Sequence, residues 1–306
     1  MAATIFIDGA VGTTGLEIAQ RLEGRSEFAQ IILDDERRKD EAARREALND
    51  ADFAILCLPD AAAIDAAAMA SNARTKIIDA SSAHRTAPDW AYGFPEFRQG
   101  QREAIASASR ISNPGCYPTG FLALIAPLVK GGLIPADYPI TCNAVSGYSG
   151  GGKALIERFE SENNIGFRTY GLNMGHKHVP EMALYSGLEN APLFAPSVIH
   201  AFRGMMVEVP LIRTAQMASK AEMQACLADH YEHEPLVNIA AMPESGELLV
   251  RDGADGRDAL QLTVAGDDEH IRLIAMLDNL GKGASGAAIQ NLNIAAGLDE
   301  AAGLRV

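Results

Sequence analysis

The sequence lacks the features that place a chain in a membrane or in the secretory pathway. No window of the 306 residues approaches about eighteen uninterrupted apolar residues, the minimum for a membrane-spanning helix. The first residues, Met1 to Ile7, carry no basic side chain, which a secretory signal peptide would need. We therefore expect a cytoplasmic protein.

Cysteine is scarce, and positive charge is outnumbered. The four cysteines, Cys57, Cys116, Cys142 and Cys226, form no Cys-x-x-Cys pair, so neither a zinc site nor a disulfide framework is indicated. Three of them are interpreted as small buried hydrophobes, with Cys116 as the exception. Lys and Arg number 26 against 40 Asp and Glu, giving a formal net charge of −14. This balance argues against a nucleic-acid or anionic-membrane partner, since each needs a basic face.

The length and the pattern of apolar residues predict two domains. A chain of 306 residues exceeds what one hydrophobic core usually serves. In the first part, strands alternate with helices, which indicates a parallel, doubly wound sheet. The expected strands there are 4–8, 31–33, 54–58 and 76–79, with helices after residue 15 and at 60–73.

The pattern changes after about residue 135, where strand-like segments follow one another. They are 140–145, 198–202, 205–212 and 260–264, with helices at 151–161 and 218–231 and a closing helix from residue 285. This predicts a mixed or antiparallel sheet with helices on one face. The predicted fold class is therefore α/β: a Rossmann-type doubly wound parallel sheet plus an α+β domain.

A glycine-rich turn follows the first strand and begins a helix, which is the context that a dinucleotide site requires. In Gly9-x-x-Gly12-x-x-Gly15, the glycines would allow a tight turn, close approach of a pyrophosphate and close helix–strand packing. Thr13 and Thr14 would contribute amides and hydroxyls to the phosphates at the helix N-terminus.

The residues after the second strand leave the choice between NAD and NADP open. Asp34 stands about twenty residues beyond the glycines, where an acid would bind the NAD ribose. Arg37 and Arg38 follow at once and could bind the 2′-phosphate of NADP.

Cys116 lies in a setting unlike those of the other cysteines. In Ser112-Asn-Pro-Gly-Cys116-Tyr-Pro-Thr-Gly120 it precedes an apolar helical segment, with Pro118 in the first turn. A helix N-terminus favours a thiolate, and the neighbouring glycine leaves room for a carbonyl group. We interpret Cys116 as a nucleophile that attacks an activated acyl group and forms a thioester, which hydride from a nicotinamide cofactor then reduces to an aldehyde.

Such a reaction needs a proton donor and base, usually histidine. His176 and His178 lie in Gly175-His-Lys-His-Val-Pro-Glu181, between glycine and proline. In an extended segment the two side chains would point to the same side, about 7 Å apart. We prefer His176 for proton transfer, because Gly175 leaves room beside it, and His178 with Glu181 for the substrate. The alternatives are a pair of metal ligands, for which no third His or Cys is nearby, and a surface loop without a role.

These segments resemble the N-acetyl-gamma-glutamyl-phosphate reductase family in its shorter form. The similar segments run nearly from end to end: 9–15, Asp79-Ala-Ser-Ser-Ala-His-Arg85, Tyr92-Gly-Phe-Pro-Glu96, 112–119, Ala144-Val-Ser-Gly-Tyr-Ser-Gly-Gly151, 175–181 and Asp278-Asn-Leu-Gly-Lys-Gly-Ala-Ser-Gly286. The Asn-Pro-Gly-Cys and Asn-Leu-x-Lys-Gly patterns are shared with the related aspartate-semialdehyde dehydrogenases. The His-Lys-His-Val-Pro-Glu and Tyr-Gly-Phe-Pro-Glu segments point to the acetylglutamyl branch.

The resemblance implies reduction of N-acetylglutamyl phosphate with NADP in arginine biosynthesis, by a homodimer or homotetramer. It implies an NADP-binding Rossmann domain at 1–115, a catalytic and oligomerisation domain at 116–280 and a C-terminal helix, 281–306, that packs back on the first domain. The expected catalytic residues are Cys116, His176 and His178, with no metal. The expected cofactor-binding residues are Gly9, Gly12, Thr13, Thr14, Gly15, Arg37, Arg38, Leu58, Pro59, Ser146, Gly147, Asn279 and Lys282. The expected substrate-binding residues are Arg85, Asn113, Glu181 and Arg203.

Two other functions share parts of this pattern. A reductase of aspartyl phosphate or of carrier-bound aminoadipyl phosphate would keep Cys116 and the cofactor glycines and differ in its substrate contacts. A regulator with a Rossmann fold but no catalysis would not need both Cys116 and the two histidines.

Overall fold

The chain folds into two compact units. The computed structural model describes residues 2–162, 164–251 and 256–306. The first unit comprises Met1–Gly115 and Ala284–Leu304, and the second comprises Cys116–Gly283 and Arg305–Val306. One boundary falls between Gly115 and Cys116, directly before the predicted nucleophile. No helix within the described ranges is long and apolar enough to cross a membrane.

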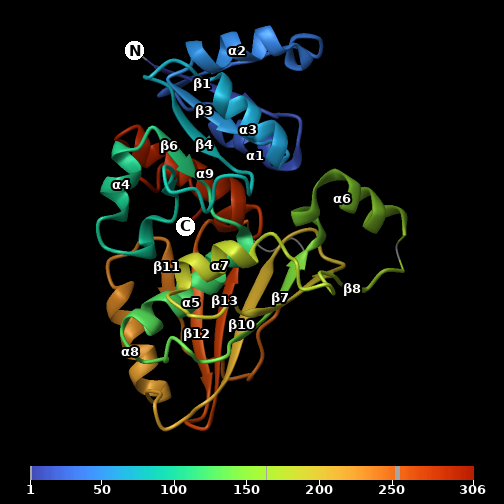
Figure 1. Ribbon diagram of the computed structural model, residues 1–306. Helices are drawn as coiled ribbons and strands as arrows, with labels where there is room; N and C mark the ends of the chain where they lie inside the picture. Colours follow the sequence, from blue (N-terminus) through green and yellow to red (C-terminus); the bar gives the residue numbers. More distant parts are fainter. Residues whose placement is uncertain (1, 163, 252–255) are drawn as a thin grey trace. The chain divides into compact units, whose positions relative to one another are not determined.

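The first unit is built on a six-stranded sheet in the order β2-β1-β3-β4-β6-β5, in which every described pairing is parallel. Figure 1 labels β1, β3, β4 and β6 of this sheet. The strands are β1 (Ala3–Asp8), β2 (Phe28–Ile31), β3 (Phe53–Leu56), β4 (Lys76–Asp79), β5 (Ala91–Tyr92) and β6 (Arg110–Ser112). The connection from β2 to β3 passes over β1, so the order reverses at β1, where open α/β sheets bind their ligands.

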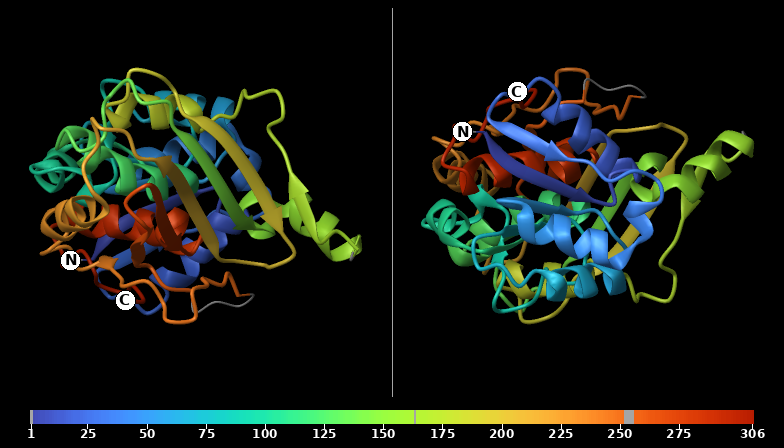
Figure 2. Two further views of the ribbon diagram at one scale, coloured as in Figure 1. Left: turned by 90° about the horizontal axis from the view of Figure 1, so that it is seen from below. Right: turned by 90° about the horizontal axis from the view of Figure 1, so that it is seen from above.

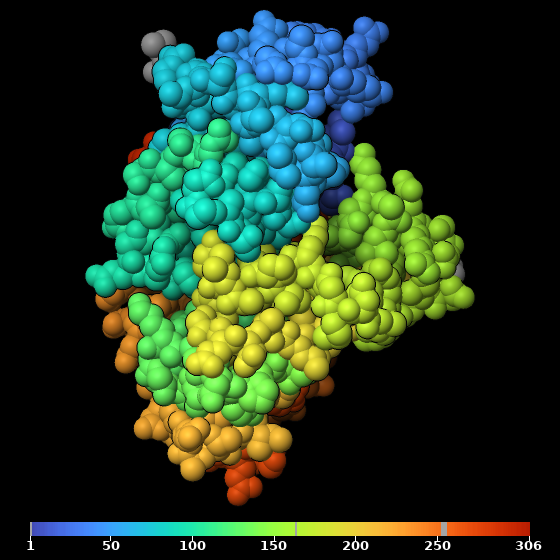
Figure 3. Space-filling view, in the orientation of Figure 1, coloured from blue at the N-terminus to red at the C-terminus, as the bar shows by residue number. Residues whose placement is uncertain are grey.

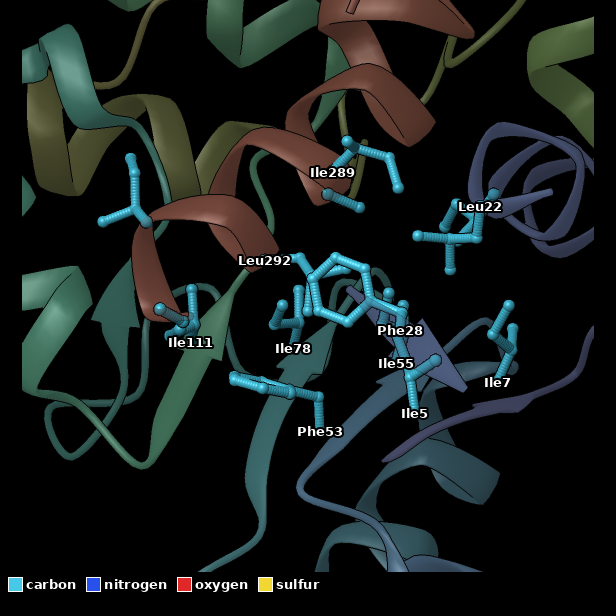
Figure 4. Packing of buried hydrophobic residues seen from close by; sticks show 14 of the residues in the cluster. Ile5, Ile7, Leu22, Phe28, Phe53, Ile55, Ile78, Ile111, Ile289 and Leu292 are labelled. Atoms are coloured by element: carbon cyan, nitrogen blue, oxygen red, sulfur yellow. The ribbon is translucent and has the colours of Figure 1, made fainter. Parts of the chain in front are cut away.

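Helices cover both faces of this sheet, as a doubly wound fold requires. They are α1 (Thr13–Leu22), α2 (Glu41–Asp50), α3 (Asp60–Met69), α4 (Gln101–Ser107) and α9 (Gly286–Ala295). On one face, Ile5, Ile55 and Ile78 pack against Leu22 of α1 and Leu292 of α9 (Figure 4). A second cluster joins Phe6 and Leu56 to Leu48 of α2 and to alanines of α3.

The second unit contains a mixed seven-stranded sheet in the order β11-β12-β13-β10-β7-β9-β8. Its strands are β7 (Thr141–Gly147), β8 (Phe167–Thr169), β9 (Leu193–Ile199), β10 (Met205–Ile212), β11 (Val237–Ile239), β12 (Leu260–Gly266) and β13 (His270–Leu277). β7 pairs in parallel with β9, whereas β10 runs antiparallel to both β7 and β13.

Helices α5 (Cys116–Lys130), α7 (Val179–Ser186) and α8 (Lys220–His230) lie together on one side of the seven-stranded sheet (Figure 1). α5 packs closely on the strands, because a Cβ at Gly120 would lie 2.8 Å from the Val207 side chain. Helix α6 (Gly152–Ser161) and β8 project from the rest of this unit (Figures 2 and 3). The predicted fold class, a Rossmann-type sheet plus an α+β domain, is confirmed.

Two of the predicted strands were misplaced. β2 ends at Ile31 rather than Leu33, and shortly after it the Asp34 carboxylate accepts hydrogen bonds from the N–H groups of Glu36 and Arg37 in a turn. The strand predicted at 198–202 is instead β9, which ends at Ile199. Beyond it, the carbonyls of Ala201 and Phe202 accept from the backbone at 148–149 instead of extending the ladder.

Candidate active site

The first unit contains a pocket of about 390 Å³ at the carboxyl end of β1. Of the predicted cofactor-binding residues, Gly9, Gly12, Arg38, Leu58 and Pro59 line it. Thr13, Thr14 and Gly15 form the start of α1 beside it, and Gly12 is the N-cap of that helix.

The glycine loop has the backbone geometry that a dinucleotide needs. Gly9 has φ +93°, and a Cβ there would lie 2.3 Å from the Cys57 carbonyl oxygen. A Cβ at Gly15 would lie 2.4 Å from the Gly9 carbonyl oxygen, so this glycine allows the helix to pack on the turn. Gly12 meets only one described atom, at 3.4 Å, which leaves its open side for a phosphate group. The loop therefore fits the group that its sequence pattern predicts.

The residues after β2 differ in whether they can reach this pocket. Arg37 is not among the described lining residues and instead donates to Glu46 at 2.9 Å. Arg38 lines the pocket and donates to Asp35 at 2.7 Å. One oxygen of the Asp34 carboxylate, Oδ1, accepts from the backbone N–H groups of Arg37 at 2.8 Å and Glu36 at 3.1 Å.

Two predicted substrate residues lie together in the first unit. Arg85 is buried and donates through Nε to the Asn113 carbonyl oxygen at 2.9 Å. The Asn113 side chain donates to the Ala284 carbonyl oxygen and accepts from Asn291, each at 3.0 Å. These bonds fix the strand end that leads to Cys116.

In the second unit Cys116 is the first residue of α5, so the predicted helix start is confirmed. The thiol is neither fully buried nor fully exposed. Gly283 packs against it, since a Cβ at Gly283 would lie 2.9 Å from the Cys116 Cβ. By contrast, burial raises the pKa of Cys57 to about 12 and also raises the pKa values of Cys142 and Cys226. Those three thiols stay protonated at neutral pH.

His176 and His178 lie beside Tyr117, the neighbour of Cys116. Their ring centroids are 6.2 and 5.7 Å from that of Tyr117 and 4.8 Å from each other. The expectation of an extended segment was wrong: His178 is helical in conformation and is the N-cap of α7, and the N–H of Val179 donates to the His176 carbonyl oxygen. This turn brings the two rings closer than an extended chain would.

The environment of His176 fixes its proton state. The ring is packed among Tyr117, Tyr170, His178 and Phe194. Burial, followed by the positive charge of Lys177, lowers the pKa of His176 to about 4. Its Nδ1 accepts from the backbone N–H of His178 at 3.2 Å, so the proton of the neutral ring is on Nε2.

The segment after β13, from Asp278 to Lys282, contains two predicted residues and contacts a third, Arg203. Arg203 donates to both carboxylate oxygens of Asp278, at 2.5 and 3.0 Å. Asn279 donates to Ser149 at 2.9 Å and accepts from the N–H of Gly204 at the same distance. Three further predicted residues also belong to this unit. Ser146 and Gly147 are the last two residues of β7, and Lys282 is buried in the π-helical turn Gly281–Ser285.

Glu181, the last predicted substrate residue, is buried in the first turn of α7, three residues after His178. Within the described ranges, no group of three His, Cys, Asp or Glu side chains is placed to hold a metal ion.

Sequence reasoning missed four residues of these sites: Arg44, Tyr117, Tyr170 and Gly283. Tyr117 donates to the Ser197 carbonyl oxygen at 3.1 Å, and the Tyr170 hydroxyl donates to that of Tyr117 at 3.4 Å. Burial raises the pKa of Tyr117 well above its usual value, so its hydroxyl stays protonated. Two of the four had a sequence signal: Tyr117 lies next to Cys116, and Gly283 lies in the segment 278–286.

Known proteins similar to this chain share both units. Residues 4–108 match the family "Semialdehyde dehydrogenase, NAD binding domain", and residues 116–279 match "Semialdehyde dehydrogenase, dimerisation domain". The N-acetyl-gamma-glutamyl-phosphate reductase 2 of Nostoc sp. is 47% identical over 98% of this chain and 98% of its own. The N-acetyl-gamma-glutamyl-phosphate reductase of Rhizobium meliloti is 48% identical over 96% and 99%. Aspartate semialdehyde dehydrogenase II of Vibrio cholerae has the same fold, with a TM-score of 0.73, 17% identity and coverage of 96% and 98%.

Proposed function

Because this chain belongs to the N-acetyl-gamma-glutamyl-phosphate reductase family, we propose that it reduces N-acetyl-L-glutamyl 5-phosphate to N-acetyl-L-glutamate 5-semialdehyde and phosphate, in arginine biosynthesis. The observation that carries the proposal is the position of Cys116 at the start of α5, against Gly283, with two histidines around the adjacent Tyr117. A helix start stabilises the thiolate that acyl transfer needs.

The chain's own residues account for the steps at sulfur. The Cys116 thiolate attacks the acyl carbon, and the bond from that carbon to the phosphate oxygen breaks. Phosphate departs, and the acyl group remains bound to Sγ as a thioester. A nicotinamide cofactor, which the glycine loop of the first unit would hold, would supply the hydride that reduces the thioester. Negative charge then develops on the carbonyl oxygen and is withdrawn again as the C–S bond breaks, which releases the aldehyde and restores the thiolate.

We assign proton transfer to His176. Its neutral ring presents Nε2–H, and this proton can shift towards the carbonyl oxygen as charge develops and return as the C–S bond breaks. We assign His178 and Glu181 to substrate binding, together with Arg85, Asn113 and Arg203. Ser146, Gly147, Asn279 and Lys282 are proposed to serve the cofactor.

Replacing Lys177 with an uncharged residue tests how its positive charge affects the pKa of His176. Lys177→Met is expected to raise the pKa of His176 from about 4 part of the way towards 6.5, since burial, the larger cause, remains. The His176 ring signal followed by NMR across pH 3 to 8 would report this. Lys153→Met, on the separate helix α6, should leave the titration unchanged. An unshifted His176 in Lys177→Met contradicts the electrostatic account.

The first unit's match to an NAD-binding domain supports a nicotinamide cofactor, and we propose that this cofactor is NADP. Arg38 lines the pocket as a 2′-phosphate ligand would, and the Oδ1 atom of Asp34 already accepts from two backbone N–H groups. We expect kcat/KM to be at least about tenfold higher with NADPH than with NADH, the scale of a charged hydrogen bond. Equal values for the two cofactors would reject NADP specificity.

The activity itself is tested by phosphate-dependent oxidation of the aldehyde with purified protein. Turnover is expected with N-acetylglutamate semialdehyde. Turnover with aspartate semialdehyde or a carrier-bound aminoadipate semialdehyde instead would establish one of the related reductases. No turnover with any of the three would favour a regulator.

We further propose a homodimer or homotetramer in the cytoplasm. The match of residues 116–279 to a family described as a dimerisation domain supports self-association.

A further inference from the structure

A half-buried arginine that the sequence pattern did not indicate lies in the nucleotide pocket. Arg44, in the first turns of α2, lines the pocket together with Arg38. Its Nε donates to the two carboxylate oxygens of Asp8 at 3.1 and 3.2 Å, and its Nη2 donates to one of them at 2.8 Å. Asp8 is the last residue of β1, directly before Gly9. The side chains are 17% exposed for Arg44 and 5% exposed for Asp8.

This ion pair orients the guanidinium and leaves part of it available. Asp8 occupies the edge formed by Nε and Nη2. In the described part of the chain, no protein atom accepts a hydrogen bond from Nη1, which keeps two N–H donors for a ligand. The pair also offsets the negative charge of Asp8, which would otherwise repel an anion beside the glycine loop.

The other basic residues near this pocket are less firmly held. Arg37 is 53% exposed and paired with Glu46. Arg38 lines the pocket from a surface 3₁₀ turn, where its partner Asp35 is 89% exposed. Arg44 is therefore the cation whose position is fixed before a ligand binds, which lowers the entropic cost of binding.

We propose, on the basis of the NADP use proposed above, that Arg44 binds the adenosine 2′-phosphate together with Arg38, and that Asp8 is its positioning residue. The pocket includes the end of β2 and the residues after it, at 30–33, where the adenosine ribose lies in dinucleotide-binding folds. A guanidinium fork fits phosphate geometry better than an ammonium does.

Calorimetric titration with 2′,5′-ADP and 5′-AMP isolates the 2′-phosphate without any turnover. Arg44→Met is expected to weaken binding of 2′,5′-ADP about tenfold or more and to leave binding of 5′-AMP within about twofold. Arg44→Lys, which keeps the charge without the fork, and Asp8→Asn, which releases the fork, should each cause a smaller loss for 2′,5′-ADP alone. Arg45→Met is the matched control, because Arg45 is the next residue and pairs with Glu41 on the surface.

An equal loss for both ligands in Arg44→Met would overturn the proposal, because Arg44 would then support the pocket or the pyrophosphate. Unchanged binding of both ligands would overturn it as well. If Arg44→Met does not fold, the affinities of Arg44→Lys and Asp8→Asn for 2′,5′-ADP and 5′-AMP are compared instead. A loss for 2′,5′-ADP alone supports the proposal, and an equal loss for both ligands or no loss for either overturns it. Wild-type protein that binds both ligands equally would reject the proposal and NADP specificity together. The reductase activity is judged separately, by turnover of the semialdehyde.

Discussion

Cys116→Ala is expected to abolish phosphate-dependent oxidation of the semialdehyde, with a loss of about 10⁴ or more in kcat, because Cys116 is the group proposed to carry the acyl chain. Cofactor binding should persist, since the glycine loop belongs to the first unit and Cys116 to the second. Turnover and fluorescence titration with NADPH, measured on the same preparation, separate the two effects. Activity of Cys116→Ala within tenfold of wild type would contradict the assignment of Cys116 as the nucleophile.

The other thiols provide matched controls for this variant. Cys226→Ala, on α8, removes a half-buried thiol whose pKa is raised by burial, and it should keep the chemistry with at most some loss of stability. A single-turnover experiment adds a direct test of the thioester. Wild-type protein given acyl phosphate without cofactor should release about one equivalent of phosphate rapidly, whereas Cys116→Ala should release none.

The features that the sequence predicted correctly are those with a local cause. A proline-containing first turn after Asn-Pro-Gly predicts a helix that begins at Cys116, and the structure has that helix. Gly9 is required because a Cβ there would meet the Cys57 carbonyl oxygen, and the glycine pattern after a strand is sufficient to indicate such a turn.

The features that the sequence did not predict depend on contacts between distant residues. Gly283 touches Cys116 across more than 160 residues of chain, and no local pattern reports that contact. Arg44 lies in α2, a polar helix whose buried residues are only two alanines and a leucine, so its apolar pattern is weak. The proposed role of Arg44 becomes evident only in the folded structure, where Arg44 pairs with Asp8 at the nucleotide pocket.

The sequence also did not predict which of Arg37 and Arg38 lines the pocket, although the two residues are adjacent. Both lie in the 3₁₀ turn Arg37–Lys39, in which successive side chains point about 120° apart. Two adjacent arginines in such a turn therefore point in different directions. The Asp34 carboxylate accepts from the N–H of Arg37 at the start of this turn, and Arg38 is the arginine that lines the pocket.

Replacement of His176 and His178 separates proton transfer from binding. His176→Asn is expected to lower kcat by roughly a hundredfold or more, the usual scale for general acid–base catalysis. His178→Asn is expected mainly to raise KM for the anionic substrate, because its role is proposed to be binding. Both values come from initial rates of semialdehyde oxidation at saturating cofactor.

The structure makes asparagine an informative replacement at residue 176. Its Oδ1 can accept from the N–H of His178 as Nδ1 does, so the turn before α7 is retained while Nε2–H is lost. His176→Gln is the complementary variant, since its amide N–H can reach towards the position of Nε2 without exchanging a proton. If hydrogen bonding alone matters, glutamine restores much of kcat; if a proton moves, both variants stay slow. Near-normal kcat in both His176→Asn and His178→Asn would mean that neither histidine is the acid, and the proton would then have to come from another group or from water.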